Sequence, residues 1–158
     1  MANPNRPNGF RAIRKLNGGI PQYTPKYAAS GLSIAVGDAL VITTAGILSL
    51  ATASSPAIFG VSDSKITGIA GVQQKVNVVE ATDDILFVGQ TTTWESASKR
   101  MIGSSVDIGG GSGAMILTSS TSQGVARIIG LSREMGNADG NYARMEFVFQ
   151  KSQFTGQA

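Results

Sequence analysis

The sequence predicts an all-β protein, with one β-rich domain behind an extended N-terminal segment. The 158-residue chain contains 20 glycines and only 15% charged residues, whereas soluble domains have about 7% glycine and about 25% charged residues. After residue 30, short apolar runs recur roughly every 8 to 12 residues between Gly, Ser, Asp and Asn, as in sandwiches and barrels. The 42% hydrophobic content is enough for a single core.

Residues 1–30 are predicted to form an extended arm. Four of the five prolines and four of the seven asparagines lie before residue 28, and proline removes a hydrogen-bond donor and keeps its neighbour extended. A simple disordered tail would not need the apolar residues that recur there: Phe10, Ile13, Leu16, Ile20, Tyr23 and Tyr27. The favoured interpretation is an arm that docks on another subunit. The alternatives are an arm that packs back over its own domain and a mobile tail.

The same segment holds the excess positive charge. Residues 1–37 contain five basic residues and no acidic one, so their charge is +5. Residues 38–158 carry −2, which gives the whole chain its net charge of +3. The basic residues are Arg6, Arg11, Arg14, Lys15 and Lys26. An acidic protein, nucleic acid or anionic lipid could attract them. We expect a protein partner and no nucleic acid, because the aromatic residues of the candidate strands lack the interleaved Lys and Arg on which bases stack and phosphates bind.

The domain, residues 31–158, contains nine candidate strands. Several are rich in β-branched or aromatic residues, and they span residues 39–43, 47–51, 57–62, 75–81, 85–90, 105–108, 114–118, 125–132 and 143–150. The last stretch alternates, so one face of the strand is expected to carry Met145, Phe147 and Phe149 and the other Glu146, Val148 and Gln150.

Turn residues separate these stretches. Thr44-Ala45-Gly46 and Asp83-Asp84 are predicted to be hairpin turns, and residues 136–141 to connect the last two strands. Only residues 94–101 could form a short helix. The apolar run 31–50 is interrupted by glycines and Asp38, so we interpret it as two strands and a turn rather than a signal or membrane span. We expect a soluble protein, made in a cytoplasm, with no membrane partner.

The composition argues against an enzyme. The chain has no cysteine and no histidine, which removes thiolate nucleophiles, imidazole bases and nearly every zinc, haem or iron–sulfur site. Ser62 and Lys65 have the Ser-x-x-Lys spacing of penicillin-interacting enzymes, as do Ser96 and Lys99, but the companion motifs of those enzymes are missing. We therefore expect no catalytic residue and no cofactor.

The glycine-rich stretch 109–113 (GGGSG) invites comparison with a phosphate-binding loop. It leads into a strand, however, and no Gly-Lys-Ser/Thr follows it, so a flexible loop is favoured. Asp107, just before it, supplies a single carboxylate, whereas a calcium loop needs several oxygen ligands. We expect no metal site.

The chain resembles the decoration, or cement, proteins of tailed-bacteriophage heads. The resemblance rests on the arm NPNRPNGFRAIRKLNGG, followed by VGDALVITTAGILSLAT, AIFGVS, KVNVVEA, ILFVGQT and a closing GVARIIGLS to ARMEFVFQ hairpin. It implies a compact β-barrel-like or β-tulip domain that binds the exterior of the assembled capsid, with the major capsid protein as partner. It also implies a homo-oligomer, a trimer being favoured, on the virion surface. The small members of the family lack such a long arm. Its presence here favours a protein that binds to neighbouring subunits through the arm.

The arm supplies the candidate contact residues. If it adds a strand to an exposed sheet edge, main-chain hydrogen bonds would hold it and alternate side chains would set its register. Arg6, Arg11, Arg14 and Lys15 would then meet acidic capsid surface, while Phe10, Ile13, Leu16 and Tyr23 would make apolar contacts.

Two other functions remain open from the sequence. The protein could be another virion β protein, such as a head–tail connector, a tail or fibre component, or an adhesin whose loops 109–113 and 136–141 bind a receptor or glycan. It could also be a small-molecule-binding barrel, which would be stabilised by its ligand.

Overall fold

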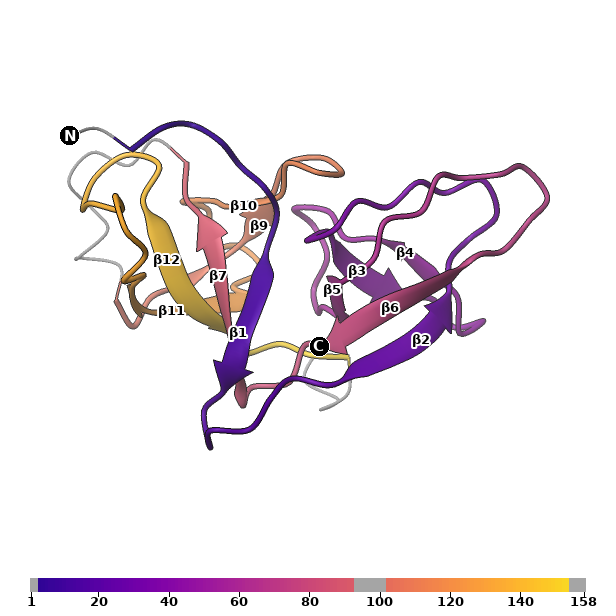
Figure 1. Cartoon of the computed structure of the whole chain (residues 1–158), viewed down its shortest axis with the longest axis horizontal. Helices are drawn as coiled ribbons and strands as arrows, with labels where there is room; N and C mark the ends of the chain where they lie inside the picture. Colours follow the sequence, from indigo (N-terminus) through magenta and orange to yellow (C-terminus); the bar gives the residue numbers. More distant parts are fainter. Residues whose placement is uncertain (1–2, 93–101, 154–158) are drawn as a thin grey trace.

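The structure, a computed structural model, describes residues 3–92 and 102–153, and every regular element in these residues is a β-strand. The all-β prediction is therefore confirmed. The strands form two five-stranded sheets and a two-stranded ribbon (Figure 1). The helix considered for residues 94–101 lies outside the described residues.

Sheet 1 has the strand order β1-β7-β12-β11-β8, and each neighbouring pair is antiparallel. Its strands are β1 (Arg11–Lys15), β7 (Ile85–Gln90), β8 (Ser105–Val106), β11 (Ala126–Leu131) and β12 (Arg144–Phe149). The predicted closing hairpin is confirmed, since β11 pairs with β12.

Sheet 2 has the order β2-β6-β5-β3-β4 and is also antiparallel throughout. Its strands are β2 (Tyr23–Tyr27), β3 (Ala39–Ile42), β4 (Leu48–Leu50), β5 (Gly60–Ser62) and β6 (Lys75–Glu80), and the separate ribbon pairs β9 (Ile108–Gly109) with β10 (Ile116–Leu117). Each of the nine predicted stretches contains a strand or part of one. Most of the strands are shorter than predicted.

The main core lies between the two sheets. Met145, Phe147 and Phe149 are fully buried, as the alternation of the last strand predicted. Phe10, Phe87, Phe147 and Phe149 form an aromatic cluster with ring centroids 5.1 to 6.0 Å apart, and sheet 2 faces it with Ala39, Val61 and Val79. The described strands therefore pack as a sandwich, and closure into a barrel is not seen among them.

A smaller core lies on the other face of sheet 2. The side chains there that alternate with the main-core residues include Leu40, Phe59 and Val78. Ala28 and Ile34, from the chain between β2 and β3, cover them. Because both faces are buried near the centre of sheet 2, consecutive apolar residues occur in its strands, such as Ala39-Leu40 in β3 and Val78-Val79 in β6.

The N-terminal segment packs on its own domain, one of the alternatives considered above. β1 forms one edge of sheet 1 and β2 one edge of sheet 2 (Figure 1). Phe10 is only 2% exposed, and its backbone N–H donates to the carbonyl of Gly37 (2.8 Å). Pro25 is tolerated because β2 has a partner on one side only. The segment is therefore part of the sandwich rather than a free-standing arm.

A buried carboxylate holds the loop before β11. Asp107 accepts hydrogen bonds from the Ser120 hydroxyl (2.5 Å) and from the backbone N–H groups of Gln123 (2.8 Å) and Gly124 (2.6 Å). Burial alone would raise the pKa of Asp107, but these hydrogen bonds outweigh it, so the pKa is lowered. The ionised carboxylate therefore stabilises the fold.

We expect Asp107→Asn to lower the free energy of unfolding at neutral pH by about 1–3 kcal/mol, because a charge-assisted acceptor is lost. A lowered folded pKa gives stability that is complete above the unfolded value of about 3.9 and is lost as pH falls through the folded value. Urea unfolding of both proteins from pH 7 downwards should show the gap closing below about pH 4. A gap independent of pH would contradict this role.

Candidate functional site

The first part of the candidate site is the N-terminal edge, residues 10–27. Arg11 lies opposite Val88 and Tyr27 opposite Lys75, so the segment runs antiparallel to β6 and β7 and crosses from one sheet to the other. In Figure 1 the indigo chain descends through β1 and continues below into β2. β1 and β2 each have a strand neighbour on one side only. Their other sides present backbone groups to which a partner strand could bind.

Most of the predicted contact residues lie on this edge with exposed side chains. Ile13, Leu16 and Tyr23 are exposed, as are Ile20 and Tyr27, which are apolar or aromatic neighbours. The basic members Arg6, Arg11 and Arg14 are exposed, and Lys15 is half-buried. The structure thus brings seven of the eight predicted residues to the surface.

Phe10 is the exception and corrects the predicted set. Its ring lies 5.2 Å from that of Phe147 and 6.0 Å from that of Phe149, inside the main core. Gly89 leaves the space for this ring, since a Cβ there would stand 2.5 Å from Phe10 Cδ1. Phe10 therefore anchors the segment to its own domain and is not available to a partner.

The second part of the site is the outer face of sheet 1, the face turned away from sheet 2. Ile85, Phe87 and Phe147 point into the main core. Leu86, Val88 and Val148 alternate with them, belong to neither core cluster and must face outward. A solvated face of an antiparallel sheet normally carries polar residues. Leu86, Val88 and Val148 are apolar instead, but they are only 2 to 7% exposed, so the chain itself already covers this apolar centre and only the side chains around it are accessible to a partner.

Two β-bulges add isoleucines to this face. The register shifts between Ala12 and Arg14 in β1 and between Ile128 and Gly130 in β11. The residues at these shifts, Ile13 and Ile129, are 39% and 42% exposed. Bulges re-aim side chains and are rarely accidental. Ile13 and Ile129 thus lie on either side of the central β7–β12 pair.

Sequence reasoning missed Ile129 and Arg127. Arg127 lies opposite Val148 and is exposed, so it shares the outer face with Ile129. Together with Ile102 and Val148 they line a hollow of about 440 Å³. The pair Ile128-Ile129 was the available signal, because two consecutive residues of a regular strand cannot both face the core. We call the N-terminal edge and this face together the docking surface.

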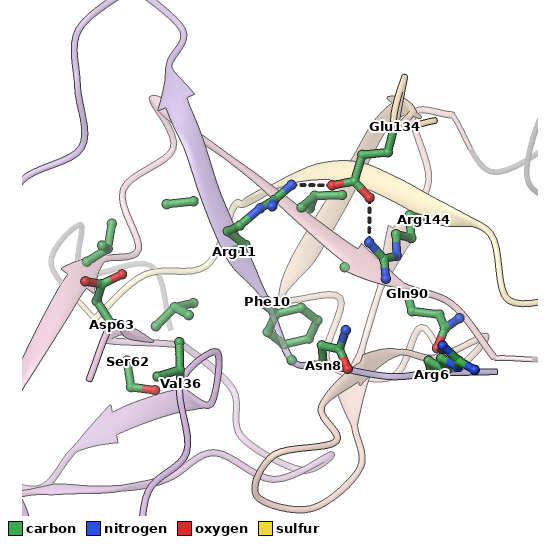
Figure 2. Close-up of a pocket in the computed structure, with 16 residues that line it drawn as sticks. Arg6, Asn8, Phe10, Arg11, Val36, Ser62, Asp63, Gln90, Glu134 and Arg144 are labelled. Carbon is green, nitrogen blue, oxygen red and sulfur yellow. Dashed lines mark hydrogen bonds and ion pairs between the residues drawn. The ribbon is translucent and has the colours of Figure 1, made fainter. Parts of the chain in front are cut away.

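Arginines surround the apolar centre of the docking surface. Arg11 is paired with Glu134, whose other oxygen lies 2.7 Å from Arg144 (Figure 2). Within the described residues, neither Arg14 nor Arg127 has a carboxylate partner. Arg14 lies opposite Leu86, next to the apolar centre. Unpaired guanidinium groups beside apolar side chains favour an acidic partner surface.

A pocket of about 180 Å³ opens beside the start of β1. Figure 2 shows the Phe10 ring between the Arg11–Glu134–Arg144 group and the side chains of Val36 and Asp63. Small-molecule sites usually have volumes of roughly 300–1,000 Å³. This pocket has the size for one side chain of a docked protein.

Two motifs considered in the sequence, Ser62 and the loop 109–113, make structural hydrogen bonds. The Ser62 hydroxyl donates to the carbonyl of Ala35 and accepts from the backbone N–H of Asp38 (3.1 Å). In the loop 109–113, the Ser112 hydroxyl and the Gly113 N–H both donate to Asp38. Ser96 and Lys99 lie outside the described residues.

Among residues 3–92 and 102–153, no three acidic side chains gather closely enough to hold a metal ion. In the same ranges there is no helix of the length and apolarity needed to cross a bilayer. No family model matches the chain, and neither does any curated protein or solved structure with which it was compared.

Proposed function

We propose that this is a non-enzymatic structural virion protein that binds the exterior of an assembled capsid and stabilises the shell. The major capsid protein is the partner, and a homo-oligomer, with a trimer favoured, is the binding unit. The observation that carries the proposal is the docking surface. It joins exposed apolar side chains, a free strand edge and two arginines, Arg14 and Arg127, that have no carboxylate partner among residues 3–92 and 102–153.

This arrangement suits adhesion to a lattice. Ile13 and Ile129 would insert into apolar depressions of the capsid surface, while Arg14 and Arg127 would meet carboxylates. Each copy would add binding free energy that exists only in the assembled shell. Linking copies in a trimer would raise the apparent affinity through effective concentration, without any new contact.

The structure also determines which experiment is informative. Removing residues 1–27 would delete β1, β2 and the core residue Phe10, so the truncated chain would be destabilised. Substitutions at the surface avoid this problem. The double variant Ile13→Ser/Ile129→Ser changes the docking surface, and Ile69→Ser/Val72→Ser changes apolar residues that are somewhat more exposed, in the loop between β5 and β6.

We expect wild-type protein and the Ile69→Ser/Val72→Ser control to co-sediment with undecorated phage heads. The Ile13→Ser/Ile129→Ser variant should bind at least about tenfold more weakly, because two apolar anchors are lost. Arg14→Glu/Arg127→Glu should weaken binding similarly, and Lys65→Glu should not. If wild-type protein binds host cells and not heads, the fibre or adhesin function replaces this proposal. Equal binding by all variants would show that another surface docks.

A further inference from the structure

The chain contains two Asn-Gly pairs in different surroundings, Asn8-Gly9 and Asn17-Gly18. In such a pair the backbone nitrogen of the glycine can attack the side-chain Cγ of the asparagine. Glycine hinders this attack least, because it has no Cβ. The reaction also needs the asparagine backbone to rotate, so local packing decides which pair reacts.

Asn17-Gly18 lies in the exposed connection between β1 and β2. Gly18 has φ +88°, and no atom lies within 4 Å of the position its Cβ would take. The side-chain oxygen of Asn17 accepts a hydrogen bond from the Gly19 N–H (3.1 Å). This bond holds the Asn17 side-chain amide close to the backbone of Gly18. The Gly18 N–H donates to the carbonyl of Lys15 (3.0 Å). That exposed bond is the main local restraint on the attack.

Asn8-Gly9 is held by the core. A Cβ on Gly9 would stand 2.6 Å from the carbonyl oxygen of Gly37, so the two backbones are in close contact. The next residue, Phe10, is buried and bonded to the same carbonyl. Figure 2 shows Asn8 beside the Phe10 ring. Rotation at Asn8 therefore requires the segment to leave the core.

We propose that Asn17 is a site of spontaneous deamidation in the folded protein and that Asn8 is protected. The Gly18 nitrogen loses its proton to solvent base and bonds to Asn17 Cγ, and the amide nitrogen leaves as ammonia. Water then opens the five-membered imide at either carbonyl and gives aspartate or isoaspartate. The net reaction consumes one water and releases one ammonia.

The product changes the N-terminal edge. A new carboxylate appears between the basic residues of β1 and Lys26 of β2, and it lowers the charge of residues 1–37 from +5 by one. The isoaspartate form also adds a methylene to the backbone in the connection between the two edge strands. The edge therefore becomes less basic as the protein ages, whatever its partner.

The test is peptide mass spectrometry of full-length protein after incubation in mildly alkaline buffer. We expect residue 17 to gain the one-unit mass increase of amide-to-carboxyl conversion, with a second chromatographic peak for isoaspartate. Residue 8 should convert at least about tenfold more slowly in the folded chain. In urea the two residues should convert at similar rates, which controls for the intrinsic chemistry.

Asn17→Gln is the matched variant, since its longer side chain would have to close a six-membered ring. It should remove the fast conversion and leave residue 8 unchanged. The proposal is overturned if residue 17 of the native protein converts no faster than residue 8, whether both residues convert or both stay asparagine. Neither result depends on binding to phage heads, so it leaves the proposed function to its own test.

Discussion

Phe10→Ala is expected to lower the free energy of unfolding by about 3–5 kcal/mol, the usual cost of removing a fully buried aromatic side chain. Phe10 is the point at which the N-terminal segment enters the core, against Phe147 and Phe149. Its removal leaves a cavity and also loses the edge-to-face contacts of its ring. Urea unfolding at neutral pH measures the loss.

The same substitution should release the N-terminal segment before the rest of the domain unfolds. Backbone hydrogen exchange of residues 11–15 should accelerate more than that of β12, because β1 is an edge strand. Ile13→Ala, two residues from the end of β1, is the control and should change stability by no more than about 0.5 kcal/mol. A loss below about 1 kcal/mol for Phe10→Ala would contradict the placement of the ring in the core.

The second large effect is expected at Asp38, which connects sheet 2 to the β9–β10 ribbon. Its carboxylate accepts from the Ala35 N–H (2.8 Å), the Ser112 hydroxyl (2.5 Å) and the Gly113 N–H (2.7 Å). Asp38 is fully buried, and within the described residues these donors, rather than a cation, stabilise its charge. Asp38→Ala would leave the donors without their acceptor.

We expect Asp38→Ala to cost about 2–4 kcal/mol, since lost hydrogen bonds to a charged group are worth roughly 1.5–3 kcal/mol and the desolvation of the carboxylate is recovered. Differential scanning calorimetry is the measurement. Ser112→Ala removes one donor, but Ser112 is exposed and water can take its place, so the cost should be only about 0.5–1.5 kcal/mol. Asp63→Ala, at an exposed carboxylate, should be neutral. If Asp38→Ala proves as mild as Ser112→Ala, the loop is not held through the carboxylate.

The strands of the domain were predictable because their signals are local. Alternation in β12 and turn residues between β3 and β4 are visible within a few residues of sequence. β1 and β2 carry no such signal. Their sequences, RAIRK and YTPKY, are polar or contain proline, and they become strands only by pairing with β7 and β6, more than 45 residues away.

Long-range contacts also explain the other errors. The loop 109–113 was expected to be flexible, but Asp38 holds it from 75 positions away in the chain. Basic and apolar composition was enough to propose Ile13 and Arg14 as contact residues, and the structure places both on the surface. Ile129 and Arg127 required the strand register and the position of a bulge, which the sequence alone did not supply.

The pairing of the N-terminal edge has a consequence for synthesis on the ribosome. All five strands of sheet 2 lie within residues 23–80, whereas sheet 1 needs residues 11–149. Translation therefore completes the strand set of sheet 2 while much of sheet 1 is still untranslated. β1 is made before its partner β7, so its apolar residues are exposed to chaperones and other nascent chains during that interval.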